Sequence, residues 1–118
     1  MTIDLSYLRM VSDGSKDFEK EILETSLQYL PTELDLLFKA ISTRNYPDIK
    51  AKAHKLKSSF NVVGINHETI LEQLDTNSSL DSNVLDQFAE RLRQIFDESL
   101  VLLKEELEEN YNEQNINR

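Results

Sequence analysis

The 118-residue sequence contains very few residues that interrupt a helix. It has two glycines and two prolines, while Leu, Glu, Lys and Gln are abundant. Glycine and proline are the residues that most often mark turns and end helices, so their scarcity favours long helices over many short strands. The sequence therefore predicts an all-α fold.

The length and the absence of cysteine narrow the class of protein. A chain of this size suits one domain, which we expect to span residues 1–118. Without cysteine there is no disulfide scaffold, no thiolate catalysis and none of the commoner structural zinc sites. No signal peptide and no run of about 20 apolar residues appears, so no membrane span is predicted. We expect a cytoplasmic monomer.

Apolar residues recur at helical spacing along most of the chain. A short helix is predicted at residues 4–10, and Ser15 is placed to cap the helix that follows. Apolar positions from Phe18 to Ile41 keep the same phase on both sides of Pro31. This favours one long kinked helix, with a break at Pro31 as the alternative. Asn45 is expected to take a left-handed conformation in the connection that follows.

Three more helices are predicted, at residues 47–63, at 66–76 with Asn66 as the cap, and from Asp81 onward. The apolar stripe of the last helix fades after Leu107, so residues 110–118 are expected to form a frayed polar tail. Amphipathic helices with short connections bury their stripes against one another. We therefore expect an antiparallel four-helix up-and-down bundle with a short additional N-terminal helix.

Charge is unevenly distributed along the chain. The formal net charge is −9, which argues against non-specific binding to nucleic acid or to anionic membranes. Between Arg44 and His67, however, five basic residues accompany the single acidic residue Asp48, so this segment carries a formal charge of +4. A basic segment in an acidic protein predicts a docking surface for an acidic partner site, although lysines on the solvent face of a helix are a simpler explanation.

The predicted helix at residues 47–63 places one histidine among polar side chains. At about 100° per residue, one sector is apolar and must be buried: Ile49, Ala53, Leu56, Phe60 and Val63. A second sector is polar: Lys50, His54, Lys57, Ser58 and Asn61. His54 is therefore expected to be exposed. Lys57 lies one turn further on, close enough for its ammonium to reach a group attached to the imidazole.

The segment Ala53-His54-Lys55-Leu56-Lys57-Ser58-Ser59, followed by Gly64, resembles the signature of histidine phosphotransfer (HPt) domains. The resemblance spans residues 4–105 and includes an Asp-Leu-x-x-Leu opening at Asp4, a Gly14 break and an aspartate at Asp48. The chain departs from the family at Ser58, where glycine is usual. The serine side chain is expected either to crowd a phosphoryl group or to donate a hydrogen bond to it.

The resemblance implies a phosphorelay intermediate. His54 would accept a phosphoryl group on Nε2 from an aspartyl phosphate of a receiver domain and pass it to another receiver. Lys57 would neutralise the phosphoryl charge, with Ser58 and Gly64 in supporting roles. Lys50, Lys55 and Asn61 would contact the receiver, and Gln73 is a weaker candidate for orienting the imidazole. Magnesium is expected only on the receiver, so this chain would need no cofactor and would act as a carrier that is not a turnover enzyme.

Other interpretations remain open at the level of sequence. Ser58 could impair transfer and leave a receiver-binding module, or the chain could be the phospho-accepting domain of a hybrid or chemotaxis-type histidine kinase. A metal site shared by His54 and His67 is disfavoured, because the spacing is poor and nearby lysines repel cations.

Overall fold

The computed structural model describes residues 3–111, and this part of the chain is almost entirely helical. The helices are α1 (Ser6–Ser12), α2 (Lys16–Ser42), α3 (Tyr46–Val62), α4 (Ile70–Thr76) and α5 (Ser82–Asn110). Within residues 3–111 the only β interaction is an isolated antiparallel bridge between Ile3 and Ile65. The predicted all-α class is confirmed.

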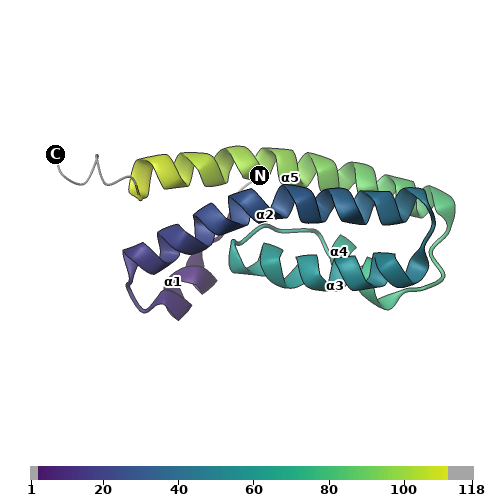
Figure 1. Ribbon diagram of the computed structural model, residues 1–118, viewed down its shortest axis with the longest axis horizontal. Helices are drawn as coiled ribbons and strands as arrows, with labels where there is room; N and C mark the ends of the chain where they lie inside the picture. The colour runs from purple at the N-terminus through teal and green to yellow at the C-terminus, as the bar shows by residue number, and fades with distance from the viewer. Residues whose placement is uncertain (1–2, 112–118) are drawn as a thin grey trace.

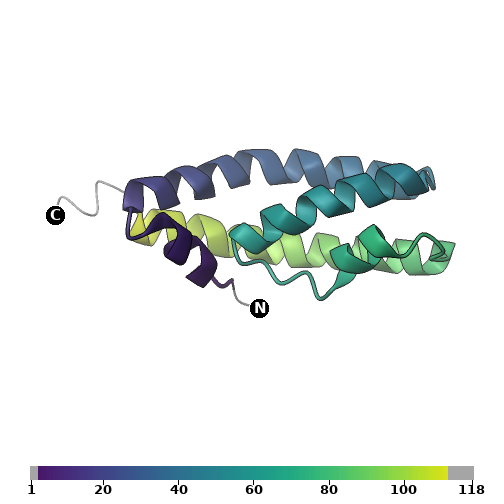
Figure 2. The ribbon, with the colours of Figure 1, turned by 90° about the horizontal axis from the view of Figure 1, so that it is seen from below.

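The two longest helices define an elongated molecule, 54 Å along its longest axis. Figure 1 shows α2 and α5 side by side along this axis, with α3 running back beneath α2. The view in Figure 2 shows α4 beside α3, and α1 near the start of α2. Helix α3 packs against both α2 and α4, and α1 packs against α2 and α3. The histidine-bearing helix is thus held on several sides.

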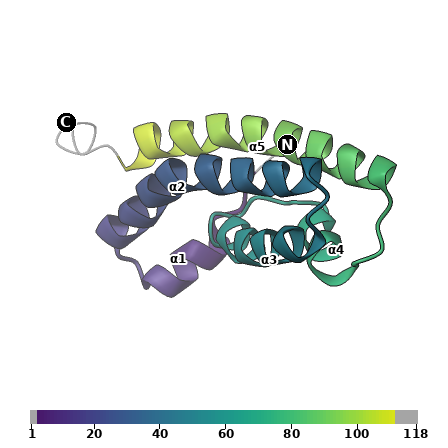
Figure 3. The same cartoon turned by 45° about the vertical axis from the view of Figure 1, so that its right-hand side comes forward.

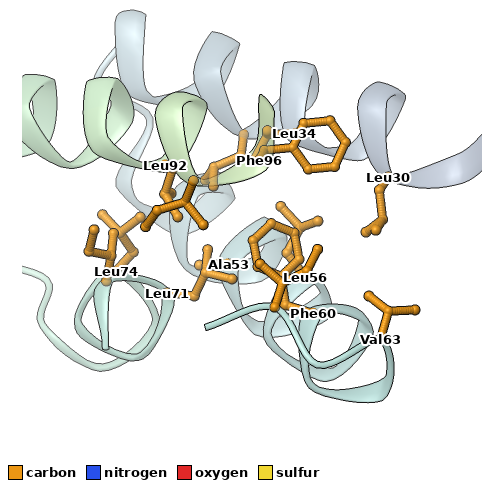
Figure 4. Close-up of a cluster of buried hydrophobic side chains, with 14 of the residues drawn as sticks. Leu30, Leu34, Ala53, Leu56, Phe60, Val63, Leu71, Leu74, Leu92 and Phe96 are labelled. Atoms are coloured by element: carbon orange, nitrogen blue, oxygen red, sulfur yellow. The ribbon is translucent and has the colours of Figure 1, made fainter. Parts of the chain in front are cut away.

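Apolar side chains from α2, α3, α4 and α5 meet in one core (Figure 4). The stripe predicted for the histidine helix is fully buried there, and the Phe60 and Phe96 rings stack with their centroids 6.3 Å apart. Burying a side chain of this size contributes about 1.5–3 kcal/mol. The core therefore fixes the rotation of α3 about its axis and, with it, the direction of the opposite face.

Three helix starts are capped by side chains, and the cap at Ser15 was predicted from the sequence. The side chains of Ser15, Asn45 and Asp81 each accept a hydrogen bond from the backbone N–H three residues later. Helix α2 continues through Pro31, so the prediction of one long helix is confirmed. Figure 3 shows the first part of α2 inclined to the remainder, as expected when proline removes a hydrogen bond inside a helix.

Two local predictions are wrong. Arg44, and not Asn45, takes the left-handed conformation before α3, with φ = 54°. The helix expected from residue 66 begins only at Ile70, because Glu68 and Thr69 both have positive φ. Asn66 instead accepts the Glu68 N–H in a local turn at 2.8 Å. Left-handed residues do not continue a helix, so α4 has only seven residues.

The C-terminal end of the described chain meets the end of α1 and the start of α2 in a small buried polar cluster. Ser12 and Tyr111 both donate hydrogen bonds to the carboxylate of Glu19, which is buried. These two bonds hold the pKa of Glu19 below its usual value, in the order Ser12 and then Tyr111. Burial, together with the bond to Glu19, raises the pKa of Tyr111 to about 12. The frayed tail expected from residue 110 is therefore contradicted at Asn110 and Tyr111, and residues 112–118 lie outside the described part.

None of the helices within residues 3–111 combines the length and apolar character needed to cross a membrane.

Candidate functional site

His54 projects from the solvent-facing side of α3. Its side chain is 72% exposed, while Ala53 and Leu56 on the opposite side of the helix are buried. The predicted exposure of His54 therefore agrees with the structure. The core packing of α3 leaves no alternative, because rotating the helix to bury His54 would expose Phe60.

Asp75 of α4 anchors the imidazole. Its Oδ2 atom lies 2.9 Å from Nδ1 of His54. Asp75 is a buried residue beside Leu71 and Leu74, which fasten α4 to the core. A carboxylate accepts hydrogen bonds, so Nδ1 of a neutral ring carries the hydrogen and Nε2 carries the free lone pair. The hydrogen bond thus selects the nitrogen that can act as a nucleophile.

Lys57 joins the same group of side chains. Its ammonium lies 2.9 Å from Oδ2 of Asp75, the oxygen that also bonds His54, and 2.6 Å from Oε2 of Glu72. His54, Lys57, Glu72 and Asp75 are called the His54 cluster below. Lys57 and Asp75 are mostly buried, with side chains 23% and 10% exposed, while Glu72 is 51% exposed. The cluster is therefore rigid on its inner side and open to solvent on its outer side.

The hydrogen bonds shift the titration of two members. The bond from His54, followed by that from Lys57, holds the pKa of Asp75 below its usual value. Glu72 and then Asp75 raise the pKa of Lys57. Both shifts favour the ionised forms, so Asp75 remains a carboxylate and Lys57 an ammonium throughout the physiological pH range.

The remaining polar residues predicted on this face lie outside the His54 cluster. Lys50, Ser58 and Asn61 are exposed, and the side chains of these three residues have no hydrogen bond or ion pair with another described residue. Lys55 points elsewhere: its ammonium is 3.5 Å from Glu33 and 5.1 Å from the ring centroid of Tyr29. The structure thus leaves Lys50 as a free cation next to His54, while Lys55 is paired with α2.

Gln73 does not bond the imidazole. Its Nε2 donates to Thr69 Oγ1 at 3.1 Å, within the start of its own helix. The partner of the ring is Asp75, two residues further along. Gln73 therefore lies on the expected helix, but its side chain bonds Thr69 and not His54.

Gly64 terminates the histidine helix in a position that no other residue fits. Its φ is +71°, and a Cβ built on it would lie 1.7 Å from the backbone oxygen of Asp4. Asp4 in turn donates its backbone N–H to the Gly64 carbonyl at 3.0 Å. The supporting role of Gly64 is thus structural: it lets the N-terminal segment pass across the end of α3.

An apolar cavity of about 320 Å³ opens beside the His54 cluster. It lies between the start of α3, the end of α4 and the α4–α5 loop, and one wall is closed by the Tyr46 hydroxyl, which donates to the Leu80 carbonyl at 2.9 Å. A shallower depression contains His54 itself, and the two hollows share Pro47, Lys50 and Asp75. The cavity therefore borders the surface around His54.

Sequence reasoning missed Glu72 and Asp75 as members of the site. A usable signal was present, because acidic residues three apart on a helix share one face, and this helix directly follows the one that carries the lysines. The buried positions Ile70, Leu71 and Leu74 fix the direction of that acidic face. The pairing of the two helices was the information that the sequence lacked.

The second histidine has a different environment. His67 is half-buried and packs against Phe60, with ring centroids 6.4 Å apart, and its burial lowers its pKa. Among residues 3–111, no group of three or more histidine, cysteine or acidic side chains is arranged to hold a metal ion.

Comparison with known proteins returned no match to a family model, to a curated protein or to a solved structure.

Proposed function

We propose that this protein is a histidine phosphotransfer carrier that receives a phosphoryl group on Nε2 of His54 from a receiver-domain aspartyl phosphate and passes it to another receiver. One observation supports the proposal most strongly. The His54 ring is exposed to solvent, and at the same time its Nδ1 atom is hydrogen-bonded to Asp75, which leaves Nε2 free. An exposed histidine without such a partner would have no hydrogen bond to hold the hydrogen on Nδ1.

The transfer step needs no general base. The lone pair of Nε2 forms a bond to phosphorus while the bond between phosphorus and the receiver's aspartyl oxygen breaks, and that electron pair returns to the receiver's carboxylate. Nδ1 keeps its hydrogen, so the imidazole becomes positively charged. The Asp75 carboxylate, 2.9 Å away, stabilises that charge through an ionic hydrogen bond. The same steps in reverse release the phosphoryl group to the next receiver.

Lys57 would supply positive charge beside the imidazole. Phosphoryl transfer spreads negative charge over the equatorial oxygens, and positioning and charge neutralisation account for most of its catalysis. In the structure the Lys57 ammonium shares Oδ2 of Asp75 with the ring, so it lies beside the imidazole. Magnesium would be carried by the receiver and not by this chain.

The docking surface combines one free cation with an apolar hollow. Lys50 borders both the His54 depression and the cavity, and Ser58 and Asn61 are exposed on α3 after His54. An acidic receiver site with an apolar side chain beside it would match this surface in charge and in shape. The Ser58 side chain has no hydrogen bond to the described chain, so its hydroxyl can rotate and is available to donate a hydrogen bond to a phosphoryl group.

The helix arrangement is compatible with this proposal. Helices α3 and α5 both run back along α2, and α4 packs on α3, as in the antiparallel four-helix bundle that the HPt resemblance implies. We include this bundle, with α1 as the additional N-terminal helix, in the proposal.

Label transfer from phosphorylated receivers tests the proposed function. A panel of isolated receiver domains is charged with acetyl phosphate and Mg²⁺, freed of donor and mixed with wild type or with His54→Gln. We expect the wild type to gain acid-labile label from at least one receiver, and His54→Gln to gain none. His67→Gln is the matched control and should label as the wild type does. Equal labelling of wild type and His54→Gln would refute the proposal.

A further inference from the structure

The Lys57 ammonium is held by two carboxylates, of which only one also contacts the histidine. Asp75 bonds both His54 and Lys57, whereas Glu72 bonds Lys57 alone, at 2.6 Å. Glu72 and Asp75 are three residues apart on α4, so they face α3 together. Two of the three N–H groups of Lys57 are therefore already engaged before any phosphoryl group arrives.

The charges of the His54 cluster do not balance. With a neutral imidazole, Asp75 and Glu72 contribute two negative charges and Lys57 one positive charge, so the cluster carries a net charge of −1. Transfer of a phosphoryl group adds one further negative charge. Like charges within a few ångströms oppose one another even at partly exposed positions. An acidic pair next to a phosphate acceptor is therefore unfavourable for the phosphorylated state.

We propose that Glu72 is a positioning residue that competes with the phosphoryl group for Lys57 and so makes the phosphohistidine short-lived. This inference rests on the proposed function. If Lys57 stays with Glu72, the phosphoryl oxygens lack its charge. If Lys57 turns to the phosphoryl group, the Glu72 carboxylate loses the one ionic partner that it has within residues 3–111. In both cases the phosphorylated form is less stable than it would be without Glu72, which suits a carrier that must release its cargo.

Phosphoramidate tests this without a receiver. Nε2 attacks its phosphorus, the P–N bond of the donor breaks and ammonia leaves. After the donor is removed, the decay of phosphohistidine is followed by ³¹P NMR. Exposed charge pairs contribute about 0.2–1 kcal/mol, so we expect Glu72→Gln to slow the decay roughly 1.4- to five-fold. Glu72→Asp, which retains the charge, should stay closer to the wild type.

Glu33→Gln is the matched control, because it removes a carboxylate that pairs with another lysine of α3, Lys55. Its decay should equal that of the wild type. A Glu72→Gln decay that is equal to or faster than the wild-type decay would refute the inference.

A second readout separates positioning from a merely structural role. Removing the Glu72 charge should lower the pKa of the phosphoryl group, measured as the pH dependence of its ³¹P shift. If Glu72 only fastened α4 to α3, Glu72→Gln would lower Tm and leave this titration unchanged.

The two proposals also fail separately. The absence of label on wild-type His54 would refute the phosphotransfer function. If the wild type is labelled but Glu72→Gln behaves like the wild type, only the role of Glu72 is refuted.

Discussion

At the scale of single residues, the site depends on one oxygen atom. Oδ2 of Asp75 accepts hydrogen bonds from the imidazole and from the Lys57 ammonium, and the Asp75 side chain is only 10% exposed. Shielding strengthens both bonds, because fewer water molecules compete for the oxygen. The orientation of the exposed His54 ring is thereby set by the hydrogen bond of its Nδ1 atom to Asp75.

Asp75→Asn should weaken this control. An amide can donate or accept, so the preference for a hydrogen on Nδ1 should fall, and the charge that stabilises a phosphorylated ring is lost. Because His54 is largely exposed, we expect a loss of about 1 kcal/mol, or roughly five-fold in phosphorylation rate. Imidazole ¹⁵N shifts measure the tautomer directly. An unchanged tautomer ratio in Asp75→Asn would contradict the assigned role.

The sequence predicted residues of α3 better than residues of α4. His54, Lys50, Ser58 and Asn61 are exposed as the helical wheel requires, because a strong apolar stripe fixes the rotation of a 17-residue helix. The partners of Lys57 and Lys55 come from α4 and α2. Such pairings depend on which helices become neighbours, and periodicity within one helix carries no information on that.

At the scale of elements, the way in which α3 ends constrains the N-terminal segment. Gly64 is left-handed and contacts the Asp4 backbone, while Ile3 and Ile65 form a short bridge next to it. The C-terminal glycine was predictable from the sequence, since glycine commonly follows the last helical residue. The close approach of Asp4 was not, because it joins residues 60 positions apart in the chain.

Gly64→Ala and Gly14→Ala form a matched pair for testing this contact. Both glycines have positive φ, but a Cβ at Gly14 would have no heavy atom within 4 Å. We expect Gly14→Ala to reduce the free energy of unfolding by about 1–2 kcal/mol, the cost of the left-handed conformation. Gly64→Ala should cost about 1–3 kcal/mol more because of the clash with Asp4. Urea denaturation measures the free energy of unfolding of both variants. Equal losses of stability would show that the chain relieves the clash at Gly64→Ala without a cost.

The boundaries of α4 show where local signals compete. Asn66 is a good capping residue, but its side chain closes a two-residue turn, and Glu68 and Thr69 then take left-handed conformations. The helix start is delayed to Ile70, whose side chain is buried with Leu71 and Leu74. Tertiary packing of these residues decided the boundary, and the capping preference alone could not predict it.

At the scale of the whole molecule, ion pairs reduce the basic segment to a small patch. Arg44 pairs with Asp86, Lys55 with Glu33 and Lys57 with two carboxylates. Lys50 and Lys52 are left without an ionic partner in residues 3–111. The formal charge of +4 read from the sequence therefore overstates the field that a partner would meet, and shape must contribute more to docking.

Ser78→Phe tests the contribution of shape. Ser78 lines the apolar cavity, is exposed and has no hydrogen bond to the described residues, so a phenyl ring can occupy the cavity without removing a contact. We expect phosphoramidate labelling of His54 to be unchanged. Transfer from a receiver should fall about ten-fold, as when a central interface contact is lost.

Asn83→Phe adds the same ring at an exposed position on α5 that does not line the cavity, and should transfer normally. If Ser78→Phe transfers as fast as Asn83→Phe, the cavity takes no part in docking.

The shared oxygen of Asp75 also has a consequence for observing the molecule. A chemical change at the His54 imidazole alters its hydrogen bond to the Asp75 carboxylate. Asp75 belongs to the short helix α4, which is preceded by two left-handed residues, Glu68 and Thr69. The backbone amide NMR shifts of residues 70–76 should consequently report whether the ring is modified, although no atom of that segment is itself altered.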